Sequence, residues 1–320
     1  MKVHPINDHI FALHADIRSD DLFEGIWPIP YGVSLNCYLV KADKIALIDL
    51  VRDWVGAPNE LKSQLASLGV ALEEIDYIIL NHLEPDHTGW LREFLSINKK
   101  AIVLTTAKGA ELVKNFYFEH DRVQAVKEGD ILDLGLGQAL QFFETPNVHW
   151  PETMMTWAKE GGVLFSCDGF GSYGALGDRI FDDEISEDEH EFFEAESLRY
   201  YANIVASFGI FVKRAIEKLS SLPIRVIAPS HGIIWRANPN KIIERYLRYA
   251  DYSDGPREKE IAIIWGSMYG NTELGLKHVI EGIEEEKVPY SIHRVPNENV
   301  SFILADAYKS EGILIAMPTY

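Results

Sequence analysis

The feature that most constrains the fold is a run of metal-binding side chains directly after a short apolar segment. The apolar segment, Tyr77–Leu80, is typical of a buried strand. Four potential metal ligands follow within six residues: His82, Glu84, Asp86 and His87. Imidazole and carboxylate groups can hold first-row metal ions when they project from loops at one edge of a rigid sheet. The stretch therefore predicts a sheet scaffold with a metal site at the end of one strand.

Three further potential ligands follow short strand-like runs later in the chain: His149, Asp168 and His231. Taken singly, each has an ordinary structural explanation. A solitary His is usually a satisfied structural residue, and an Asp after a strand often closes a turn. His231 is the strongest of the three, because Gly232 permits a tight turn that presents the ring. We expect all seven side chains to converge on one metal centre, and this prediction rests on the set.

Composition narrows the class of protein. The chain has 320 residues and a net charge of −19, which leaves no basic stripe for nucleic acid. Its two cysteines, Cys37 and Cys167, cannot form a disulfide framework or a four-thiolate metal site. The N-terminus lacks the apolar core of a signal peptide, and no apolar run reaches the length of a membrane span. We expect a cytoplasmic protein that binds neither nucleic acid nor membrane.

The chain up to residue 254 alternates strand and helix patterns. Its two strand-rich halves predict two sheets packed face to face with helices outside. The expected strands are 10–15, 33–40, 44–50, 77–80, 101–106, 123–126, 131–134, 139–143, 154–159, 163–166 and 225–229. The expected helices are 61–68, one that begins near Thr88, 107–117, 197–219 and 241–249.

A dense run of acids without Lys or Arg spans residues 181–196. Blocks of like charge are usually solvated, so we interpret this stretch as a loop and the start of a helix. A docking surface for a redox partner is the alternative.

A polar break with Gly and Pro at residues 251–260 marks a predicted domain boundary, which gives domains 1–254 and 255–320. Beyond it, strands at 261–265, 290–294 and 312–317 alternate with helices at 272–284 and 302–308. This βαβαβ pattern is typical of a doubly wound parallel sheet.

The ligand pattern resembles the metallo-β-lactamase fold, whose signature is His-x-His-x-Asp-His followed by later His, Asp and His ligands. In this chain Glu84 replaces the second His of that signature, and this replacement is the hallmark of the flavodiiron proteins. A carboxylate adds negative charge and a harder donor, which favours iron without excluding zinc. The resemblance implies an αββα sandwich in residues 1–254 that holds two non-haem irons.

The resemblance also implies a role for each ligand. His82, Glu84 and His149 would bind one iron, Asp86 and His231 the other, and Asp168 would bridge them. His87 is left open, because the matching His is not bound to iron in some members of the family.

The segment Gly266–Thr272 follows a strand and opens a helix, so its backbone N–H groups can hold a phosphate. It lacks the Gly-Lys-Ser/Thr ending of a Walker loop, so we do not expect ATP or GTP. It resembles the phosphate loop of flavodoxins, and the last residues of the chain resemble their second flavin loop. The resemblance implies that FMN contacts Ser267, Met268, Tyr269, Gly270, Asn271, Thr272, Pro318, Thr319 and Tyr320. A flavodoxin sheet has five strands, so we expect an incomplete flavin domain that is part of a longer protein. If the molecule itself ends here, we expect FMN to bind weakly or not at all.

The family implies reduction of dioxygen to water, of nitric oxide to nitrous oxide, or of both, with electrons from FMN. It further implies a rubredoxin-like or flavin-reductase donor and a head-to-tail homodimer or dimer of dimers. Tyr200 is a candidate hydroxyl donor to the bound gas, although a core role, or Tyr201 instead, is an alternative. Some relatives place a His near the entrance, in the segment that matches 23–32, and this chain has none there.

Two other functions compete with the reductase. A metal-dependent hydrolase of the metallo-β-lactamase superfamily would need neither Glu84 nor the flavin loops. An electron carrier with a vestigial metal site would need a broken ligand set, whereas every ligand is present.

Overall fold

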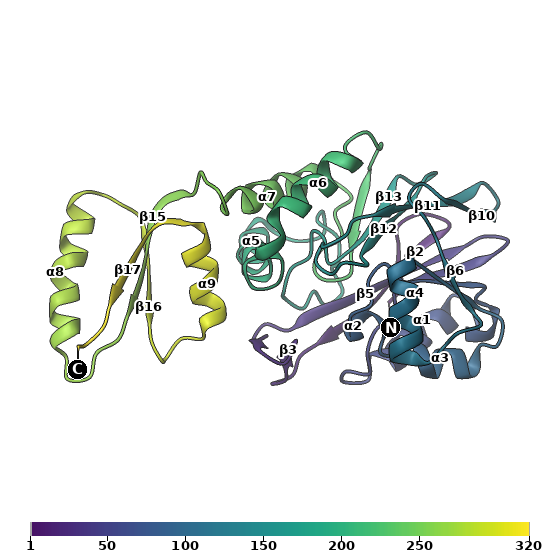
Figure 1. Ribbon diagram of the computed structural model, residues 1–320, viewed down its shortest axis with the longest axis horizontal. Coiled ribbons are helices and arrows are strands. Elements are labelled where there is room, and N and C mark those ends of the chain that lie inside the picture. Colours follow the sequence, from purple (N-terminus) through teal and green to yellow (C-terminus); the bar gives the residue numbers. More distant parts are fainter. Residues whose placement is uncertain (1, 320) are drawn as a thin grey trace.

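The computed structural model describes residues 2–319 and shows two lobes of unequal size (Figure 1). The larger lobe runs from His4 to Asp251 and holds two central sheets. The smaller lobe runs from Glu258 to Ala316 and holds one sheet. Within these described residues, no helix is both long and apolar enough to cross a membrane.

The first sheet of the larger lobe has seven strands in the order β1-β2-β5-β6-β7-β8-β9. The pairs from β1 to β6 are antiparallel, and those from β6 to β9 are parallel. Parallel pairing brings the carboxyl ends of β6, β7 and β8 to one edge of the sheet, where the ligand loop begins. Its strands are β1 (His4–Pro5), β2 (Ile10–Ile17), β5 (Val33–Lys41), β6 (Ile45–Ile48), β7 (Tyr77–Ile79), β8 (Ile102–Thr105) and β9 (Val123–Ala125).

The second sheet has five strands in the order β10-β11-β12-β13-β14. Its last pair, β13 and β14, is parallel, so these strands also end at one edge. A separate two-stranded hairpin, β3 (Leu22–Phe23) with β4 (Trp27–Pro28), precedes β5. The strands of the second sheet are β10 (Ile131–Gly135), β11 (Gln138–Glu144), β12 (Met154–Ala158), β13 (Val163–Cys167) and β14 (Val226–Pro229).

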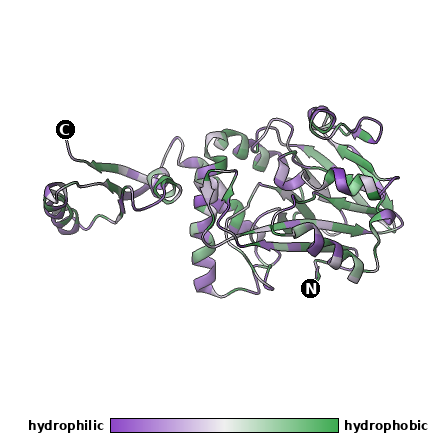
Figure 2. Ribbon diagram, turned by 90° about the horizontal axis from the view of Figure 1, so that it is seen from below, coloured by the Kyte–Doolittle hydropathy of each residue, from purple (hydrophilic) through white to green (hydrophobic). Residues whose placement is uncertain are grey.

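Helices cover the outer sides of the two sheets, as predicted (Figure 1). Helices α1, α3 and α4 lie beside the first sheet, and α5, α6 and α7 lie beside the second. The apolar side chains of both sheets form one continuous buried core, and Figure 2 shows the hydrophobic stretches concentrated on the inner strands. The helices of this lobe are α1 (Ala57–Ser67), η1 (Leu72–Glu74), α2 (Pro85–Thr88), α3 (Leu91–Ile97), α4 (Ala107–Tyr117), α5 (Glu187–Tyr200), η2 (Tyr201–Val205), η3 (Ala206–Phe208), α6 (Gly209–Leu219) and α7 (Pro239–Asp251).

The smaller lobe is a three-stranded parallel sheet in the order β16-β15-β17. Helix α9 lies on the side of the sheet that faces the larger lobe, and α8 lies on the far side (Figure 1). The βαβαβ prediction is therefore confirmed. Its elements are β15 (Glu258–Trp265), α8 (Asn271–Glu285), β16 (Tyr290–Arg294), α9 (Val300–Lys309) and β17 (Ser310–Ala316).

Two helix predictions were wrong. Two short helices, α2 and α3, take the place of the one expected to begin near Thr88. Helix α2 begins at Pro85, whose ring is pre-organised for a first helical position, and it ends before α3 begins. The long helix expected at 197–219 begins ten residues earlier, at Glu187. Ser186 and Glu189 form a capping box there, in which each side chain accepts a hydrogen bond from the other's backbone N–H. It is then interrupted by the π-helical segment η2 before α6.

Several acids of the 181–196 stretch have basic partners elsewhere in the larger lobe. Glu189 pairs with Arg179, and Glu194 pairs with both Arg245 and Arg248. The stretch is a loop followed by the start of α5, as predicted, but it is not solvated throughout, because Asp182 and Glu196 are buried.

Candidate metal centre

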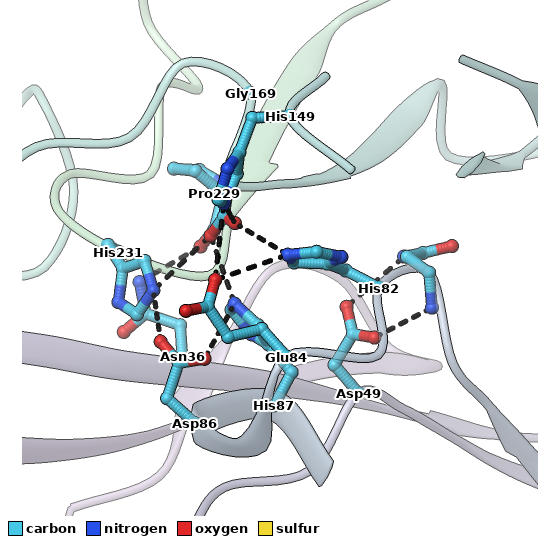
Figure 3. Close-up of polar contacts among 12 residues, drawn as sticks. Asn36, Asp49, His82, Glu84, Asp86, His87, His149, Gly169, Pro229 and His231 are labelled. Carbon is cyan, nitrogen blue, oxygen red and sulfur yellow. Dashed lines mark hydrogen bonds and ion pairs between the residues drawn. The ribbon is translucent and has the colours of Figure 1, made fainter. Parts of the chain in front are cut away.

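The predicted ligands meet at one edge of the two sheets of the larger lobe (Figure 3). The loop after β7 supplies four of them, and Asp168 and His231 follow β13 and β14 directly or within two residues. His149 lies between β11 and β12. Each ligand thus follows or lies between strands of a buried core, which fixes the backbone from which the side chain projects.

One group of ligands consists of His82, Glu84, His149 and Asp168, whose ligand atoms all lie within 4.8 Å of one another. The Nε2 atoms of His82 and His149 lie 3.3 and 3.2 Å from Glu84 Oε2. They lie 3.4 and 3.2 Å from Asp168 Oδ2. Two imidazole nitrogens and two carboxylate oxygens therefore surround one point.

A second group consists of Asp86, His87 and His231. His231 Nε2 lies 3.2 Å from Asp86 Oδ2 and 3.3 Å from Asp168 Oδ1. His87 Nε2 lies 3.0 Å from the same Asp168 oxygen and 3.5 Å from Asp86 Oδ1. One oxygen of Asp168 thus faces the first group and its other oxygen faces the second. His87, which the sequence left open, lies in the second group.

Two imidazoles are oriented by hydrogen bonds at their other ring nitrogen. His82 Nδ1 contacts Glu152 Oε1 at 2.8 Å, and His231 Nδ1 contacts the Ser34 carbonyl oxygen at 2.8 Å. Each partner is an acceptor, so it holds the proton on Nδ1 and leaves Nε2 free to bind a cation. Glu152 also accepts a hydrogen bond from Leu83 N at 3.0 Å, which ties the ligand loop to the 149–153 segment.

Asp49, at the end of β6, supports the ligand loop from the neighbouring strand (Figure 3). Its carboxylate accepts hydrogen bonds from Asn81 N at 2.8 Å and Asn81 Nδ2 at 3.2 Å. Neither Asp49 nor Glu152 was predicted from the sequence as part of the site. Asp49 ends a predicted strand, which is a weak signal, and Glu152 has no local pattern that distinguishes it.

The charges of the cluster are mutually dependent. Burial lowers the pKa of His149, but hydrogen bonds to Asp168 and Glu84 outweigh burial and raise it to about 9. Burial likewise lowers the pKa of His231, but its contacts with Asp168 and Asp86 outweigh burial and raise this pKa to about 10. Burial alone would raise the pKa of Asp168, but the surrounding imidazoles lower it well below its usual value. The anionic oxygens therefore stabilise positive charge at both groups.

The donor set fits two metal cations. Asp86 Oδ1, His87 Nε2, Asp168 Oδ1 and His231 Nε2 are buried, point toward one another, and have no hydrogen-bond partner among the described residues. Buried polar atoms without partners are costly unless something satisfies them. The Cys167 thiol lies within 4.8 Å of the ligand atoms of His87 and Asp168, but burial raises the pKa of this thiol well above the usual value, so it stays protonated. The remaining donors are imidazoles and carboxylates, which suit a first-row ion such as iron.

A cavity of about 440 Å³ lies at the mouth of the cluster and is lined by Glu84 and Asp86 together with the β3–β4 hairpin. Glu24, in the turn of this hairpin, is a mouth residue that the sequence analysis missed. Burial and then the nearby Glu84 carboxylate raise the pKa of Glu24 to about 7. The segment in which some relatives have a His thus presents a carboxyl group here.

Tyr200 and Tyr201 have different surroundings. The Tyr200 ring is fully buried, its centroid lies 5.9 Å from that of His231, and its hydroxyl has no partner among the described residues. Burial and then Asp168 raise its pKa well above the usual value, so the hydroxyl keeps its proton. Tyr201 instead packs against tyrosines of α7 and α9, including Tyr246 at 5.2 Å and Tyr308 at 6.0 Å.

The two predicted flavin loops follow β15 and β17, which are adjacent parallel strands and therefore end at the same edge. Gly270 has φ +88 and is the N-cap of α8, and its N–H donates to Ser267 Oγ at 3.0 Å. The order β16-β15-β17 places this edge at the switch point where doubly wound sheets bind ligands. Pro318 and Thr319 lie beyond β17, and Tyr320 lies outside the described residues.

The fold and the ligand set define a class: a sandwich like that of the metallo-β-lactamases with two adjacent groups of side chains that could hold metal ions, followed by a flavodoxin-like parallel sheet. The family model described as "ODP family beta lactamase" matches residues 33–232. A mutant of a flavo di-iron protein from Thermotoga maritima is 31% identical, with a TM-score of 0.87 over 98% of this chain and 79% of that one. Rubredoxin oxygen:oxidoreductase from Desulfovibrio gigas is 28% identical, with a TM-score of 0.90 over 100% of this chain and 78% of that one.

Among curated proteins, an anaerobic nitric oxide reductase flavorubredoxin from Vibrio vulnificus is 34% identical over 100% of this chain. One from Salmonella arizonae is 37% identical over 90% of it. The chain spans 64% and 59% of the lengths of these two relatives. The chain belongs to the flavodiiron protein family.

Proposed function

We propose that this chain is the metal-binding part of an oxidoreductase that reduces dioxygen to water, nitric oxide to nitrous oxide, or both, at a non-haem diiron site. The observation that carries the proposal is the position of Asp168, which presents one oxygen to each of two ligand groups. Glu84, where a zinc hydrolase of this fold has a His, makes the first group rich in hard anionic donors.

His82, Glu84 and His149 would hold one iron, and Asp86, His87 and His231 the other, with Asp168 between them. When bound, two ferrous ions and a reduced flavin supply the four electrons that convert dioxygen to two waters, and two electrons suffice to join two nitric oxide molecules as nitrous oxide and water. Glu152 and the Ser34 carbonyl would keep the imidazoles oriented. The mouth cavity would admit a small neutral gas.

Tyr200 would donate a hydrogen bond to the bound gas. Its unpartnered hydroxyl and its proximity to His231 support this role, and burial, followed by the nearby Asp168 carboxylate, raises its pKa and keeps the phenol protonated. The Tyr201 hydroxyl is also without a partner among the described residues, but its ring packs against Tyr246 and Tyr249 in the helical layer rather than against a ligand of the cluster, so it is a less suitable donor.

The chain would divide into a metal-binding domain, residues 1–254, and part of a flavin domain, residues 255–320. The second would supply part of an FMN site. The FMN phosphate would bind at the N-terminus of α8, where backbone N–H groups and the Ser267 hydroxyl can donate hydrogen bonds to an anion without the help of a basic side chain. Electrons would come from a rubredoxin-like or flavin-reductase donor. A head-to-tail homodimer would bring the flavin of one subunit to the metal site of its partner.

The test is to load the chain with iron, reduce it anaerobically with a chemical reductant, and measure consumption of nitric oxide or dioxygen. Zinc-loaded protein is the matched control and should consume neither gas. Turnover of a chromogenic ester or lactam is measured in parallel. Hydrolysis by the zinc form, together with failure of the iron form to consume either gas, would establish the hydrolase instead.

Glu84→His provides the sharper comparison, because it restores the His-x-His signature. We expect this variant to bind zinc in preference to iron when both are supplied, and to lose gas reduction. If it retained iron and activity, the role assigned to Glu84 would be wrong.

A further inference from the structure

Arg199 is a fully buried cation outside the metal cluster that contacts three separate parts of the molecule. Only 2% of its surface is exposed. Its Nε and Nη2 donate to the two carboxylate oxygens of Glu196, one turn earlier on α5, at 3.0 and 2.6 Å. A buried pair of this kind is a poor source of stability, because the desolvation of both charges offsets their attraction. The pair with Glu196 therefore does not by itself account for the buried cation, whose remaining nitrogen, Nη1, has other partners.

That nitrogen, Nη1, donates to two acceptors that belong to different elements. One is the carbonyl oxygen of Pro28 on β4, at 3.0 Å, and the other is Ser301 Oγ on α9 of the smaller lobe, at 2.8 Å. The guanidinium plane also lies between the rings of Tyr173 and Phe302, at 4.2 and 4.6 Å from their centroids. Only a planar fork of several donors can make this set of contacts, and a lysine ammonium cannot reproduce it.

The Pro28 end of this connection leads to the mouth of the metal site. Pro28 pairs with Leu22 in the β3–β4 hairpin, and the same hairpin carries Phe23 and Glu24, which line the mouth cavity. Phe23 lies edge-on to the His231 ring, with 5.4 Å between centroids. A shift of the hairpin would therefore change both the mouth and the packing of one proposed ligand.

The Ser301 end leads to the smaller lobe. Ser301 is fully buried near the N-terminus of α9, and its carbonyl oxygen accepts a second hydrogen bond, from Asn203 Nδ2 on η2, at 3.1 Å. Phe302, the next residue, covers the guanidinium. Helix α9 thus holds one side of Arg199 while the hairpin holds another.

We propose that Arg199 is a positioning residue that couples the seating of the smaller lobe on α5 to the position of the β3–β4 hairpin at the mouth of the metal site. When α9 is seated, Ser301 and Phe302 fix the guanidinium so that its other Nη1 hydrogen points at the Pro28 carbonyl. When α9 is displaced, that restraint is lost and the hairpin bond weakens. Coupling of this kind is reciprocal. Its consequence for gas access rests on the proposed function.

Hydrogen exchange tests the coupling without any metal or turnover. The Gly25 and Ile26 amides report on the hairpin, since they donate to Leu22 O and Phe23 O within it. Ser301→Ala removes the hydrogen bond from Arg199 to the smaller lobe and leaves the Phe302, Glu196 and Pro28 contacts in place. The variant removes one of the two hydrogen bonds of Nη1 and weakens the Pro28 bond only in part, so we expect exchange at these two amides to rise about threefold to tenfold.

Ser310→Ala is the matched control. Ser310 is an equally buried serine of the smaller lobe, and among the described residues its hydroxyl bonds to Asp306 O and Glu260 Oε1 rather than to Arg199. We expect no change in hairpin exchange in this variant. A rise confined to α9 in Ser301→Ala would overturn the coupling. An equal hairpin rise in Ser310→Ala would also overturn it, because it would indicate general loosening.

Arg199→Lys provides the second arm, because it keeps the charge beside Glu196 and loses the fork. We expect faster exchange in both the hairpin and α9. After iron loading and reduction, we expect the nitric oxide association rates of Arg199→Lys and of Ser301→Ala each to differ about threefold from that of the wild type. A purely structural role would lower the melting temperature and leave that rate unchanged. If the chain reduces neither gas, the exchange result still decides the coupling.

Discussion

The two lobes are built from similar elements but differ in how completely they bury them. The larger lobe has two sheets, helices on both outer sides, and one continuous apolar core. The smaller lobe has a separate core of three buried side chains, Ile263, Trp265 and Leu276. Its edge strand β17 leaves Ile313 and Ile315 more than half exposed, at 55% and 67%. The geometry of the ligand cluster is therefore set by a rigid scaffold, whereas the proposed flavin loops lie on a three-stranded sheet with a partly exposed edge strand and a small core.

This difference indicates that the larger lobe is stable through its own core, whereas the smaller lobe depends in part on contacts with the larger one. Ligands that must converge to within a few ångström need strand ends held by a large core. The smaller lobe gains part of its order from the larger one, through α9 and the contacts of Ser301 and Tyr308 with the helical layer. The predictions below test whether the two lobes behave as two units.

The largest effect is expected for Asp168→Asn, which removes the anionic oxygen shared by both ligand groups. Changes to outer partners of a metal ligand already cost about 10–100-fold in affinity, so we expect iron affinity to fall by at least about 100-fold. Iron content after desalting measures it. Asp182→Asn is the control, because Asp182 is a buried carboxylate that accepts from three loop N–H groups and lies outside the ligand groups. Retention of both irons by Asp168→Asn would refute the bridging role.

A matched pair of core truncations comes next. Ile79→Ala in β7 and Ile263→Ala in β15 remove the same atoms from sites that are both fully buried. Each is expected to cost about 2–5 kcal/mol in the core it belongs to. Ile79→Ala should lower iron loading, because β7 carries the ligand loop. Ile263→Ala should leave iron loading intact and make the smaller lobe sensitive to protease, as measured by mass spectrometry of the fragments. Equal iron loss in both variants would show that the lobes are one cooperative unit.

The sequence was most informative where the chemistry is local. The spacing from His82 to His87 and the apolar run before it were enough to predict a loop of potential ligands at a strand end, and the strands expected before the later potential ligands are present in the structure. Alternation of strand and helix was also enough to predict the parallel sheet of the smaller lobe.

The sequence was least informative where distant segments meet. Glu152 lies 70 residues from His82, and no spacing links the two. The hydrogen bonds of Arg199 join residues 171 and 102 positions away, so a buried arginine on a helix gave no local signal. The π-helical segment after Tyr200 was missed for the same reason, because tertiary packing rather than local propensity decides it.

The pH dependence of stability should separate metal-free from metal-loaded protein. In the metal-free chain, the pKa values of His149 and His231 are raised to about 9 and about 10, above the unfolded value of about 6.5. The folded state then binds more protons than the unfolded state across this window. Stability contributed by these groups is therefore fully present below about pH 6.5 and is lost as pH rises through 9 to 10.

We expect denaturant midpoints of the metal-free chain to fall between pH 6.5 and pH 10. The iron-loaded chain should show a flatter profile, because the metal replaces those protons. The comparison is confined to the larger lobe, where both imidazoles lie. A metal-free profile as flat as the loaded one would mean that the imidazoles are neutral in the folded state.

The smallest expected effect concerns two glycines of the smaller lobe that differ only in backbone conformation. Gly270 has φ +88 at the N-cap of α8, Gly275 lies within that helix, and neither has an atom within 4 Å of where a Cβ would be. Gly270→Ala should destabilise the lobe by about 1 kcal/mol, because a side chain is strained at this φ. Gly275→Ala should stabilise it by about 0.5–1 kcal/mol.

The protease resistance of the smaller lobe in each variant, compared with that of the wild type, measures both changes. Iron content shows whether the larger lobe is unaffected. Only Gly270→Ala should also weaken binding of FMN or inorganic phosphate, since the left-handed turn aims the first N–H groups of α8 at the proposed anion site. If both variants weakened anion binding equally, the helix rather than the turn would determine it. If neither did, the loop would not be the phosphate site, and the resemblance of the smaller lobe to flavodoxins would be one of fold alone.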